Sequence, residues 1–173
     1  MTTNVKFAKV KPDAKIPSKR EEDMGFDIYA CFDEDIMIID PHKTELIPTG
    51  IASSCDKQYG FVLSERGSTG SKGIALRAGV IDSGYRNEWF VGLTNTTDKM
   101  LCISKLSTEE TILKFAGDSR ENLKNIIVYP YDKAIAQALL VPVPKTKVME
   151  VSYEELQRIK SDRGLGKLGS SNK

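Results

Sequence analysis

The sequence predicts an all-β fold of the barrel or sandwich type. Short apolar runs recur along the chain, and turn-forming residues such as Gly, Pro, Asn and Asp separate them. Many short strands at regular spacing are typical of these two architectures. A length of 173 residues fits one domain, and helical signals are confined to two short segments.

The expected strands begin near the N-terminus and continue to residue 143. Residues 5–10 alternate between apolar and polar, and residues 35–40 contain an apolar run that ends at a Pro turn. Pro48, inside the strand expected at 45–52, favours a sheet edge or a bulge because proline cannot donate a ladder hydrogen bond. Four further strands are expected at 59–63, 88–93, 126–129 and 134–143.

Two helix starts are marked by capping residues. Ser107 and Glu110 match a capping box, in which each side chain accepts a hydrogen bond from the other residue's backbone N–H. Apolar residues follow this pair, and Gly117 marks the end of the helix. Ser152 and Glu155 form a second pair of the same kind. Both helices are expected to be short.

Composition argues against several classes of partner. The net charge is +1, and the Lys and Arg residues are scattered among Asp and Glu, whereas a nucleic-acid binder usually shows a basic patch. No apolar run approaches the roughly 20 residues of a membrane span, and the N-terminus lacks the apolar stretch of a signal peptide. We therefore expect no nucleic acid and no membrane as partners, and a cytoplasmic location.

Cysteine and histidine chemistry is not expected either. Cys31, Cys55 and Cys102 are far apart and form no CxxC pair, and His42, the one histidine of the sequence, lies in a polar turn. A zinc site and a Cys–His or Ser–His catalytic pair are therefore nearly excluded. Reduced thiols fit a cytoplasmic protein.

Five stretches carry residues suited to phosphate chemistry, and two of them lie in the first half of the chain. Asp27, within residues 25–30, is flanked by apolar neighbours. It needs a partner such as an Arg, backbone amides or a metal-water shell, unless it is an ordinary turn Asp. Residues 64–73 combine glycines, hydroxyls and cations directly after a strand. Such a stretch can bind phosphate, but it also occurs in ordinary loops.

The other three stretches lie further along the chain. Residues 79–88 predict a hairpin that carries Asp82 and Tyr85, and it could present its backbone to a base or be a plain β-turn. Gln137 interrupts an apolar strand and must be hydrogen-bonded if it is buried. Residues 163–171 are rich in Gly, Ser and cations. This composition fits a lid that orders when a ligand binds, although it is also typical of a disordered terminus.

Taken in order, the five stretches resemble the five motifs of the trimeric dUTPase family. The resemblance runs from about Lys6 to Ser171, and its most specific part is the sequence GVIDSGYR at 79–86. It implies a jelly-roll-like (β-clip) fold assembled as a homotrimer. Residues 1–160 would form the β domain. Residues 161–173 would form a flexible, swapped arm that closes over a site made by neighbouring chains.

The resemblance also implies a reaction and its catalytic residues. The chain would hydrolyse dUTP to dUMP and pyrophosphate by Mg²⁺-assisted attack of water on the α-phosphorus. Asp82 would orient and activate this water, and Gln137 would order the water and the α-phosphate. Asp27 would contact Mg²⁺ through water. The phosphates and other waters would supply the remaining ligands, because Mg²⁺ dehydrates reluctantly.

Substrate-binding roles are implied by the same motifs. Backbone groups of Gly79, Val80 and Ile81 would read uracil, and Tyr85 would pack on the deoxyribose and exclude a 2′-hydroxyl. A site built on hydrogen bonds rejects a wrong base strongly. The residues expected to contact the phosphates or to close over the substrate are Arg66, Gly67, Ser68, Arg163, Leu168, Gly169, Ser170 and Ser171.

Three departures from the family pattern affect these contacts. The second motif usually reads Arg-Ser-Gly, so the hydroxyl of Ser68 would act from a shifted position. The fourth motif usually has Arg where Ala134 stands, and the fifth has Gly-Phe where Lys167 and Leu168 stand. Leu168 would cover the uracil ring without stacking on it, and Lys167 would add attraction for phosphate.

The segment at 96–125 is longer than the short connection usual at this place in the family. Long loops in compact domains tend to be functional or disordered. A partner-binding insert is one interpretation of this segment, and a surface excursion without function is the other.

Two other functions stay open at the level of sequence. A dCTP deaminase of the same fold, or a bifunctional deaminase-triphosphatase, would release ammonia from dCTP, although the pattern around Asp82 and Tyr85 fits the triphosphatase better. The alternative from a different class is a regulatory protein that binds a partner on a dUTPase scaffold. The presence of Asp82, Tyr85, Gln137 and Arg163 argues against an inactive scaffold.

Overall fold

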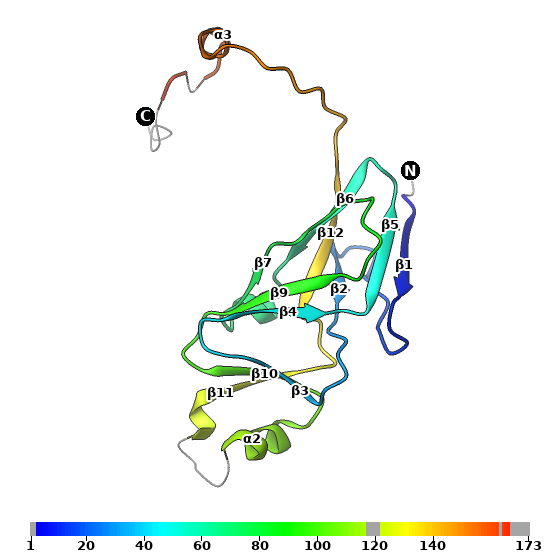
Figure 1. Cartoon of the computed structure of the whole chain (residues 1–173), viewed down its shortest axis with the longest axis vertical. Coiled ribbons are helices and arrows are strands. Elements are labelled where there is room, and N and C mark those ends of the chain that lie inside the picture. Colours follow the sequence, from blue (N-terminus) through cyan, green and yellow to red (C-terminus); the bar gives the residue numbers. More distant parts are fainter. Residues whose placement is uncertain (1–2, 117–121, 163, 167–173) are drawn as a thin grey trace. The chain divides into compact units, whose positions relative to one another are not determined.

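The computed structural model describes residues 3–116, 122–162 and 164–166 (Figure 1). The chain divides into two units, Met1–Val143 and Pro144–Lys173. The first unit contains all the sheets that the structure describes, and the described part of the second contains one short helix. Within the described ranges, no helix is long and apolar enough to cross a membrane.

The largest sheet of the first unit carries several of the residues that the sequence analysis selects. Its strands, in order across the sheet, are β2 (Gly25–Ile28), β12 (Ala136–Pro142), β6 (Tyr59–Ser64) and β8 (Val80–Ile81). All neighbours in this sheet run antiparallel. Gln137 of β12 lies opposite Asp27 of β2 on one side and opposite Ser64 of β6 on the other.

Three smaller sheets complete the first unit. Their strands are β1 (Val5–Lys9) with β5 (Ile51–Cys55); β11 (Ile126–Pro130), β10 (Met100–Ser104) and β3 (Ile36–Ile39); and β4 (Thr44–Pro48), β9 (Phe90–Asn95) and β7 (Ile74–Arg77). The neighbours in these sheets are antiparallel except for β10 and β11, which run parallel.

The parallel pairing of β10 with β11 accounts for the long connection between them. Parallel neighbours need a crossover of a dozen or more residues. Here the crossover contains the helix α2 (Thr108–Ala116) and the 3₁₀ helix η1 (Asn122–Asn125). β10 itself pairs with β3, and most of its residues are buried. The part of the segment 96–125 that leaves the sheet therefore begins after Ser104.

Aromatic side chains fill the centre of the first unit. Trp89 is fully buried, and its ring centroid lies 5.0 Å from that of Phe61 and 5.8 Å from that of Phe7. Phe26 makes edge contacts with Phe7 and Phe61. Such pairs contribute about 0.5–1.5 kcal/mol each beyond the burial of apolar area. The cluster therefore packs β1, β2 and β6 against Trp89, the residue that precedes β9.

The three cysteines are free thiols. Cys31 and Cys102 are buried, and Cys55 is partly exposed. Burial raises the pKa of Cys102 to about 11 and also raises the pKa of Cys55. Because the thiolate is the reactive form, these two thiols are poor nucleophiles at neutral pH.

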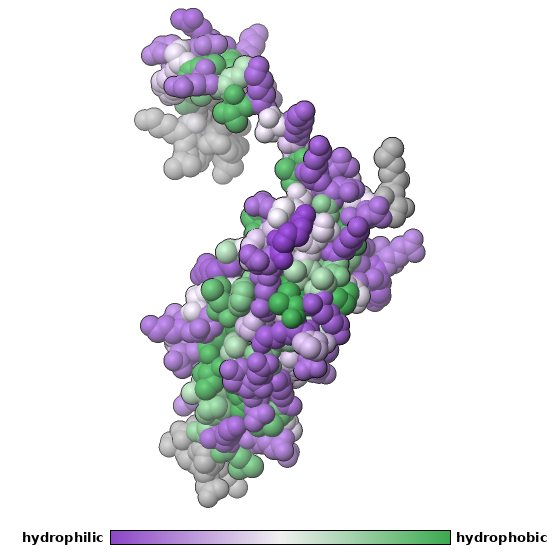
Figure 2. Space-filling view, turned by 45° about the vertical axis from the view of Figure 1, so that its right-hand side comes forward, coloured by the Kyte–Doolittle hydropathy of each residue, from purple (hydrophilic) through white to green (hydrophobic). Residues whose placement is uncertain are grey.

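Some large apolar side chains of the first unit remain exposed to solvent. Figure 2 shows hydrophobic residues gathered in patches on its visible face. The exposed fraction is 66% for Leu46, 74% for Val80 and 46% for Phe90. Patches of exposed apolar side chains are typical of a contact with another molecule.

The structure confirms most of the expected strands and corrects one. The strands expected at 5–10, 35–40, 59–63, 88–93, 126–129 and 134–143 correspond to β1, β3, β6, β9, β11 and β12. The strand expected at 45–52 is instead two strands, β4 and β5, which belong to different sheets. Gly50 lies between them with a φ of 66°, a left-handed conformation that favours glycine.

The prediction of a hairpin at 79–88 is wrong. β8 pairs with β6, whereas β9 pairs with β4 and β7. The two strands that flank Asp82 therefore lie in different sheets, and the turn connects one sheet to the next. The apolar pattern also missed β7 and β10, whose partners are distant in the sequence.

Both expected helices are present. Ser107 N–H donates to Glu110 Oε2 at 2.9 Å, and Glu110 N–H donates to Ser107 Oγ at 3.1 Å, which is the predicted capping box of α2. Glu155 N–H donates to Ser152 Oγ at 3.1 Å at the start of α3 (Tyr153–Arg158). Every described residue from 144 onward is exposed, so local caps rather than burial hold α3.

Replacing Gly50 with Ala should destabilise the first unit by about 3 kcal/mol, the combined cost of overpacking and of a left-handed alanine. An added Cβ would lie 2.8 Å from Ala14 Cβ and 2.9 Å from Cys31 Sγ. Urea denaturation followed by the fluorescence of Trp89 measures the change. Gly70→Ala is the matched control, because its Cβ would meet only Glu65 Cβ, at 3.8 Å. Equal losses in the two variants would contradict the packing argument.

Candidate active site

The predicted site residues of the first unit collect around two separate pockets. The Arg66 pocket has a volume of about 600 Å³ and is lined by Ser18, Lys19, Arg20, Asp23, Met24, Gly25, Asp27, Arg66 and Gln137. The Asp82 pocket has a volume of about 250 Å³ and is lined by Ala78, Gly79, Val80, Ile81, Asp82, Tyr85 and Phe90. The two pockets share no residue.

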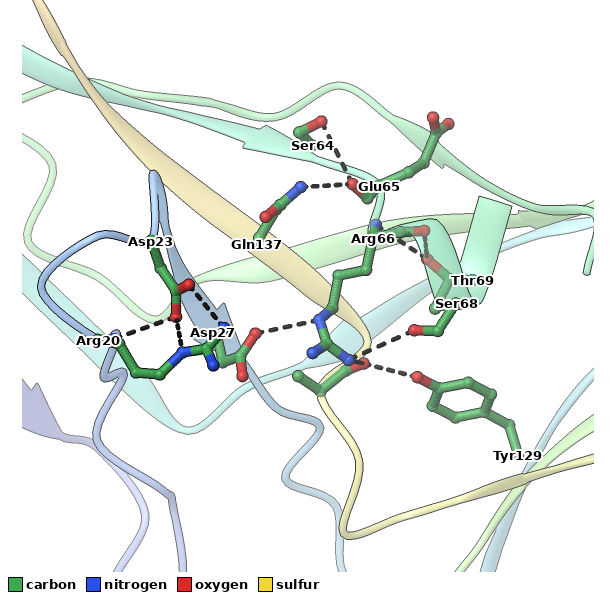
Figure 3. A network of polar contacts seen from close by, with 11 residues as sticks. Arg20, Asp23, Asp27, Ser64, Glu65, Arg66, Ser68, Thr69, Tyr129 and Gln137 are labelled. Carbon is green, nitrogen blue, oxygen red and sulfur yellow. Dashed lines mark hydrogen bonds and ion pairs between the residues drawn. The ribbon is translucent and has the colours of Figure 1, made fainter. Parts of the chain in front are cut away.

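Three parts of the chain hold the Arg66 side chain in place (Figure 3). Its Nε lies 3.0 Å from Oδ1 of Asp27, and its Nη1 donates to the carbonyl of Ala134 at 3.3 Å and to Oγ of Ser68 at 3.4 Å. The two members of the ion pair are 30% and 36% exposed, so solvent weakens their attraction. The main effect of these contacts is to fix the direction of the guanidinium group.

Gln137 joins this pocket from β12. Its Nε2 donates to the carbonyl of Glu65 at 2.8 Å, which satisfies one donor of a polar side chain within a strand. A Cβ added at Gly25 would lie 2.9 Å from Gln137 Oε1 and 3.0 Å from its Cβ. The glycine at the start of β2 therefore leaves the space that the Gln137 side chain occupies.

The Gly- and Ser-rich stretch after β6 forms a helical turn. This turn, α1 (Gly67–Gly70), follows Arg66 directly, and Arg66 N–H donates to Oγ1 of the buried Thr69 at 3.1 Å. The first N–H groups of a helix have no acceptor within it. The amides of Gly67 and Ser68 accordingly make no backbone hydrogen bond within the described part of the chain, and they lie beside Arg66.

A braced turn presents the Asp82 and Tyr85 side chains. Tyr85 N–H donates to the carbonyl of Asp82 at 3.0 Å, and the Tyr85 hydroxyl donates to the carbonyl of Glu88 at 3.0 Å. Arg86 Nη1 donates to the carbonyl of Ser53 on β5 at 3.3 Å and to two carbonyls of the turn. The side chains of Asp82 and Tyr85 stay exposed, so both can meet a ligand.

A single chain does not bring Asp82 and Gln137 together. Gln137 lies opposite Ser64 of β6, whereas Asp82 follows Ile81, which lies opposite Phe61 of the same strand. Asp82 is thus offset by about four residues, or about 13 Å, along the strand direction, and β6 separates its strand from β12. A water molecule bound to Asp82 cannot also touch a phosphate held by Gln137 of the same chain.

Part of the predicted site belongs to the C-terminal stretch. The residues Arg163, Leu168, Gly169, Ser170 and Ser171, and Lys167 beside them, lie outside the described residues. Their contacts with substrate stay predictions. His42 lines neither pocket; its Nε2 lies 2.9 Å from Asp98 Oδ1 on the surface.

The loop at 18–24 lines the Arg66 pocket although no sequence motif includes it. Arg20 forms two hydrogen bonds with Asp23, from Nε at 2.9 Å and from Nη2 at 2.8 Å. These contacts lower the pKa of Asp23 and keep it ionised. An Arg and an Asp three residues apart form a common turn pair, so no pattern in the sequence indicates that this pair faces a pocket.

The carboxylates of the Arg66 pocket are those of Asp23 and Asp27. Among the residues that the structure describes, no group of three or more His, Cys, Asp or Glu side chains is placed to hold a metal ion. A partly exposed carboxylate beside an arginine fits a cation that takes most of its ligands from water and phosphate, as Mg²⁺ does.

Comparison with known proteins identifies the family. The family model described as dUTPase matches residues 12–107. The deoxyuridine 5′-triphosphate nucleotidohydrolase of Nautilia profundicola is 30% identical over 173 residues, which cover 98% of this chain and 99% of that protein. The chain belongs to the dUTPase family.

Solved structures share the fold. A mutant dUTPase of Staphylococcus bacteriophage 80alpha with dUpNHpp has a TM-score of 0.71 at 19% identity, covering 98% of this chain and 99% of that chain. A mutant dUTPase of phage phi11 of S. aureus, described with a structural Mg(II) ion, has a TM-score of 0.64 at 20% identity, covering 87% and 99%. The predicted all-β, jelly-roll-like dUTPase fold is confirmed.

Proposed function

We propose that this chain hydrolyses dUTP to dUMP and pyrophosphate. The observation that carries the proposal is the Arg66 pocket, which the clamped guanidinium and the Gln137 amide line in a member of the dUTPase family. The Ser68 hydroxyl lies beside this pocket and accepts a hydrogen bond from the guanidinium. Guanidinium groups are strong, directional ligands of phosphate oxygens. The relative from Nautilia profundicola carries this activity in its name.

In the proposed mechanism, water attacks the α-phosphorus of dUTP and pyrophosphate leaves. Asp82 orients the water and accepts its proton as a general base. Arg66, Ser68 and the amide of Gly67 bind the phosphate oxygens and stabilise the charge that grows there during the attack. Gln137 still has an N–H that is not bonded to Glu65, and this N–H orders the α-phosphate and the water.

The backbone of β8 is assigned to uracil recognition. β8 is an edge strand of the largest sheet, so the N–H and C=O groups on its outer side are free to pair with a base. Gly79, Val80 and Ile81 line the Asp82 pocket together with Tyr85. Tyr85 would pack against the deoxyribose, where an added 2′-hydroxyl would not fit.

A homotrimer would complete the site. The offset of about 13 Å between Asp82 and Gln137 along the sheet supports a site in which these residues come from different chains. The exposed apolar side chains of Leu46, Val80 and Phe90 supply surface for self-association. In this assembly residues 1–160 are the β domain, and the arm at 161–173 of one chain closes over a site of its neighbours.

Mg²⁺ is the proposed cofactor. Asp27 would contact the ion through water, and the substrate phosphates would supply its other ligands. The partly exposed carboxylate of Asp27 supports this arrangement, because Mg²⁺ keeps several waters when it binds. When bound, the ion supplies charge that offsets the phosphates. We place the enzyme in the cytoplasm, where nucleotides and reduced thiols are available.

The substitution Asp82→Asn should reduce kcat for dUTP by about 100-fold or more, because the general base is lost. Pyrophosphate release with Mg²⁺ measures the effect, with dCTP, dTTP and UTP tested beside dUTP. Asp98→Asn is the matched control, since Asp98 is an exposed Asp that pairs with His42 and lines neither pocket. Ammonia release from dCTP would indicate the deaminase, and an inactive wild type would favour a binding role.

Two inactive variants should restore activity when their chains are mixed. Random trimers of Asp82→Asn and Gln137→Ala chains would contain sites with both wild-type residues, at about a quarter of the wild-type number if the site lies between chains. Refolding each variant alone and as an equal mixture, followed by the pyrophosphate assay, provides the comparison. If the mixture stays inactive although trimers that contain both variants are shown to be present, the site lies within one chain.

The segment at 96–125 is a second proposed binding element, this time for a protein partner. Its exposed part follows Ser104 and includes α2, on which Leu113 is 62% exposed. A variant that keeps β10 and replaces residues 107–124 with a flexible linker should remain a folded, active trimer and lose partner contacts. Cross-linking to cellular proteins compares it with wild type, and identical partner contacts in a variant of unchanged stability and assembly would exclude this role.

A further inference from the structure

The loop at 18–24 forms much of the wall of the Arg66 pocket. It contributes Ser18, Lys19, Arg20, Asp23 and Met24, whereas Arg66 and Gln137 come from other parts of the first unit. The loop precedes β2 directly and so runs into Asp27. It is thus placed next to the groups that the proposed function assigns to phosphate binding.

Backbone and side-chain contacts order this loop. Lys19 Nζ donates to the carbonyls of Arg20, Glu21 and Asp23, at 3.2, 3.3 and 2.7 Å. Asp27 N–H donates to the carbonyl of Ser18 at 2.9 Å, which fastens the start of the loop to β2. The loop therefore presents its side chains from a fixed backbone, and little ordering is needed when a ligand binds.

The three cations of the pocket differ in what they can offer. The Lys19 ammonium is occupied by loop carbonyls, and Arg66 is clamped by Asp27 and Ala134. Arg20 uses Nε and Nη2 to hold Asp23, so three of the five guanidinium N–H donors remain. Its side chain is 88% exposed, compared with 30% for Arg66, which places Arg20 toward the mouth of the pocket.

The charge of the pocket also depends on Arg20. Lys19, Arg20 and Arg66 face Asp23 and Asp27, which leaves one net positive charge among the lining residues. Without Arg20 the lining would be neutral. A neutral pocket would attract a polyphosphate more weakly than a positive one, because it would offset less of the phosphate charge.

We propose that Arg20 is a substrate-binding residue that holds the outer phosphates of a nucleoside triphosphate and makes the enzyme prefer triphosphates to monophosphates. Asp23 keeps the guanidinium plane in place through the bidentate pair (Figure 3). The N–H groups that do not bind Asp23 are the ones assigned to the phosphate. The α-phosphate lies deeper, at Arg66 and Gln137. The inference rests on the proposed function for the identity of the nucleotide, but not for the binding of phosphate.

The test compares Arg20→Gln, Arg20→Lys and Lys43→Gln with the wild-type trimer. Lys43→Gln removes one exposed positive charge away from both pockets and serves as the control. Calorimetry with Mg²⁺ measures the Kd of an imido analogue of dUTP, of dUMP and of inorganic triphosphate. Thermal unfolding checks that each variant is folded, and the pyrophosphate assay gives kcat and KM.

Arg20→Gln should weaken binding of the dUTP analogue by about 10- to 100-fold, as expected for the loss of charge-assisted hydrogen bonds. Binding of dUMP should not change, and KM should rise more than kcat falls. Arg20→Lys should give an intermediate loss, because lysine keeps the charge without the fork geometry. The control should match wild type.

Other outcomes separate the two proposals. If Arg20→Gln binds the dUTP analogue as wild type does, or loses dUMP equally, the role of Arg20 is wrong while dUTP hydrolysis stands. If wild type fails to turn over dUTP, the proposed function is wrong. Inorganic triphosphate then decides the role of Arg20 in phosphate binding: weaker binding by Arg20→Gln supports it, and unchanged binding overturns it.

Discussion

The ion pair between Asp27 and Arg66 is the contact on which the candidate site depends. It connects β2 to the chain leaving β6, and β12 with Gln137 lies between those two strands. Because both side chains are about a third exposed, the pair contributes little to stability, and its importance lies in the direction that it gives the Arg66 guanidinium. The pair also fixes the register of β2, because a slip of one residue would turn Asp27 to the opposite face of the sheet.

The largest sheet also separates the chemistry into parts. Its β12 side carries the groups suited to phosphate, and its β8 edge carries the groups suited to a base and a sugar. The two sets are displaced along the strands of one chain, and in the proposed trimer the sets of neighbouring chains would complete each other. Activity would then be coupled to assembly, so that protein concentration sets the fraction of complete sites.

Local signals in the sequence predicted local structure well. The capping pair Ser107 and Glu110 and the strand that contains Gln137 depend on neighbouring residues, and both are present. The break at Gly50 and the separation of β8 from β9 depend on which distant strands pair, and a run of apolar residues does not contain that information. For the Arg66–Asp27 contact, the sequence predicted only that Asp27 needs a partner, and not which residue this partner is. The contribution of Arg20 to a pocket could not be expected at all, since its neighbours there come from three other segments.

The crossover through α2 also bears on how this protein can be redesigned. A longer crossover would lower the stability of the fold only slightly, since doubling the length of a flexible loop costs about 0.6 kcal/mol of closure entropy. The strands on either side, β10 and β11, are paired along their full length and do not rely on the connection for their register. A fluorescent or affinity domain could therefore be inserted into the crossover, whose described residues line neither pocket.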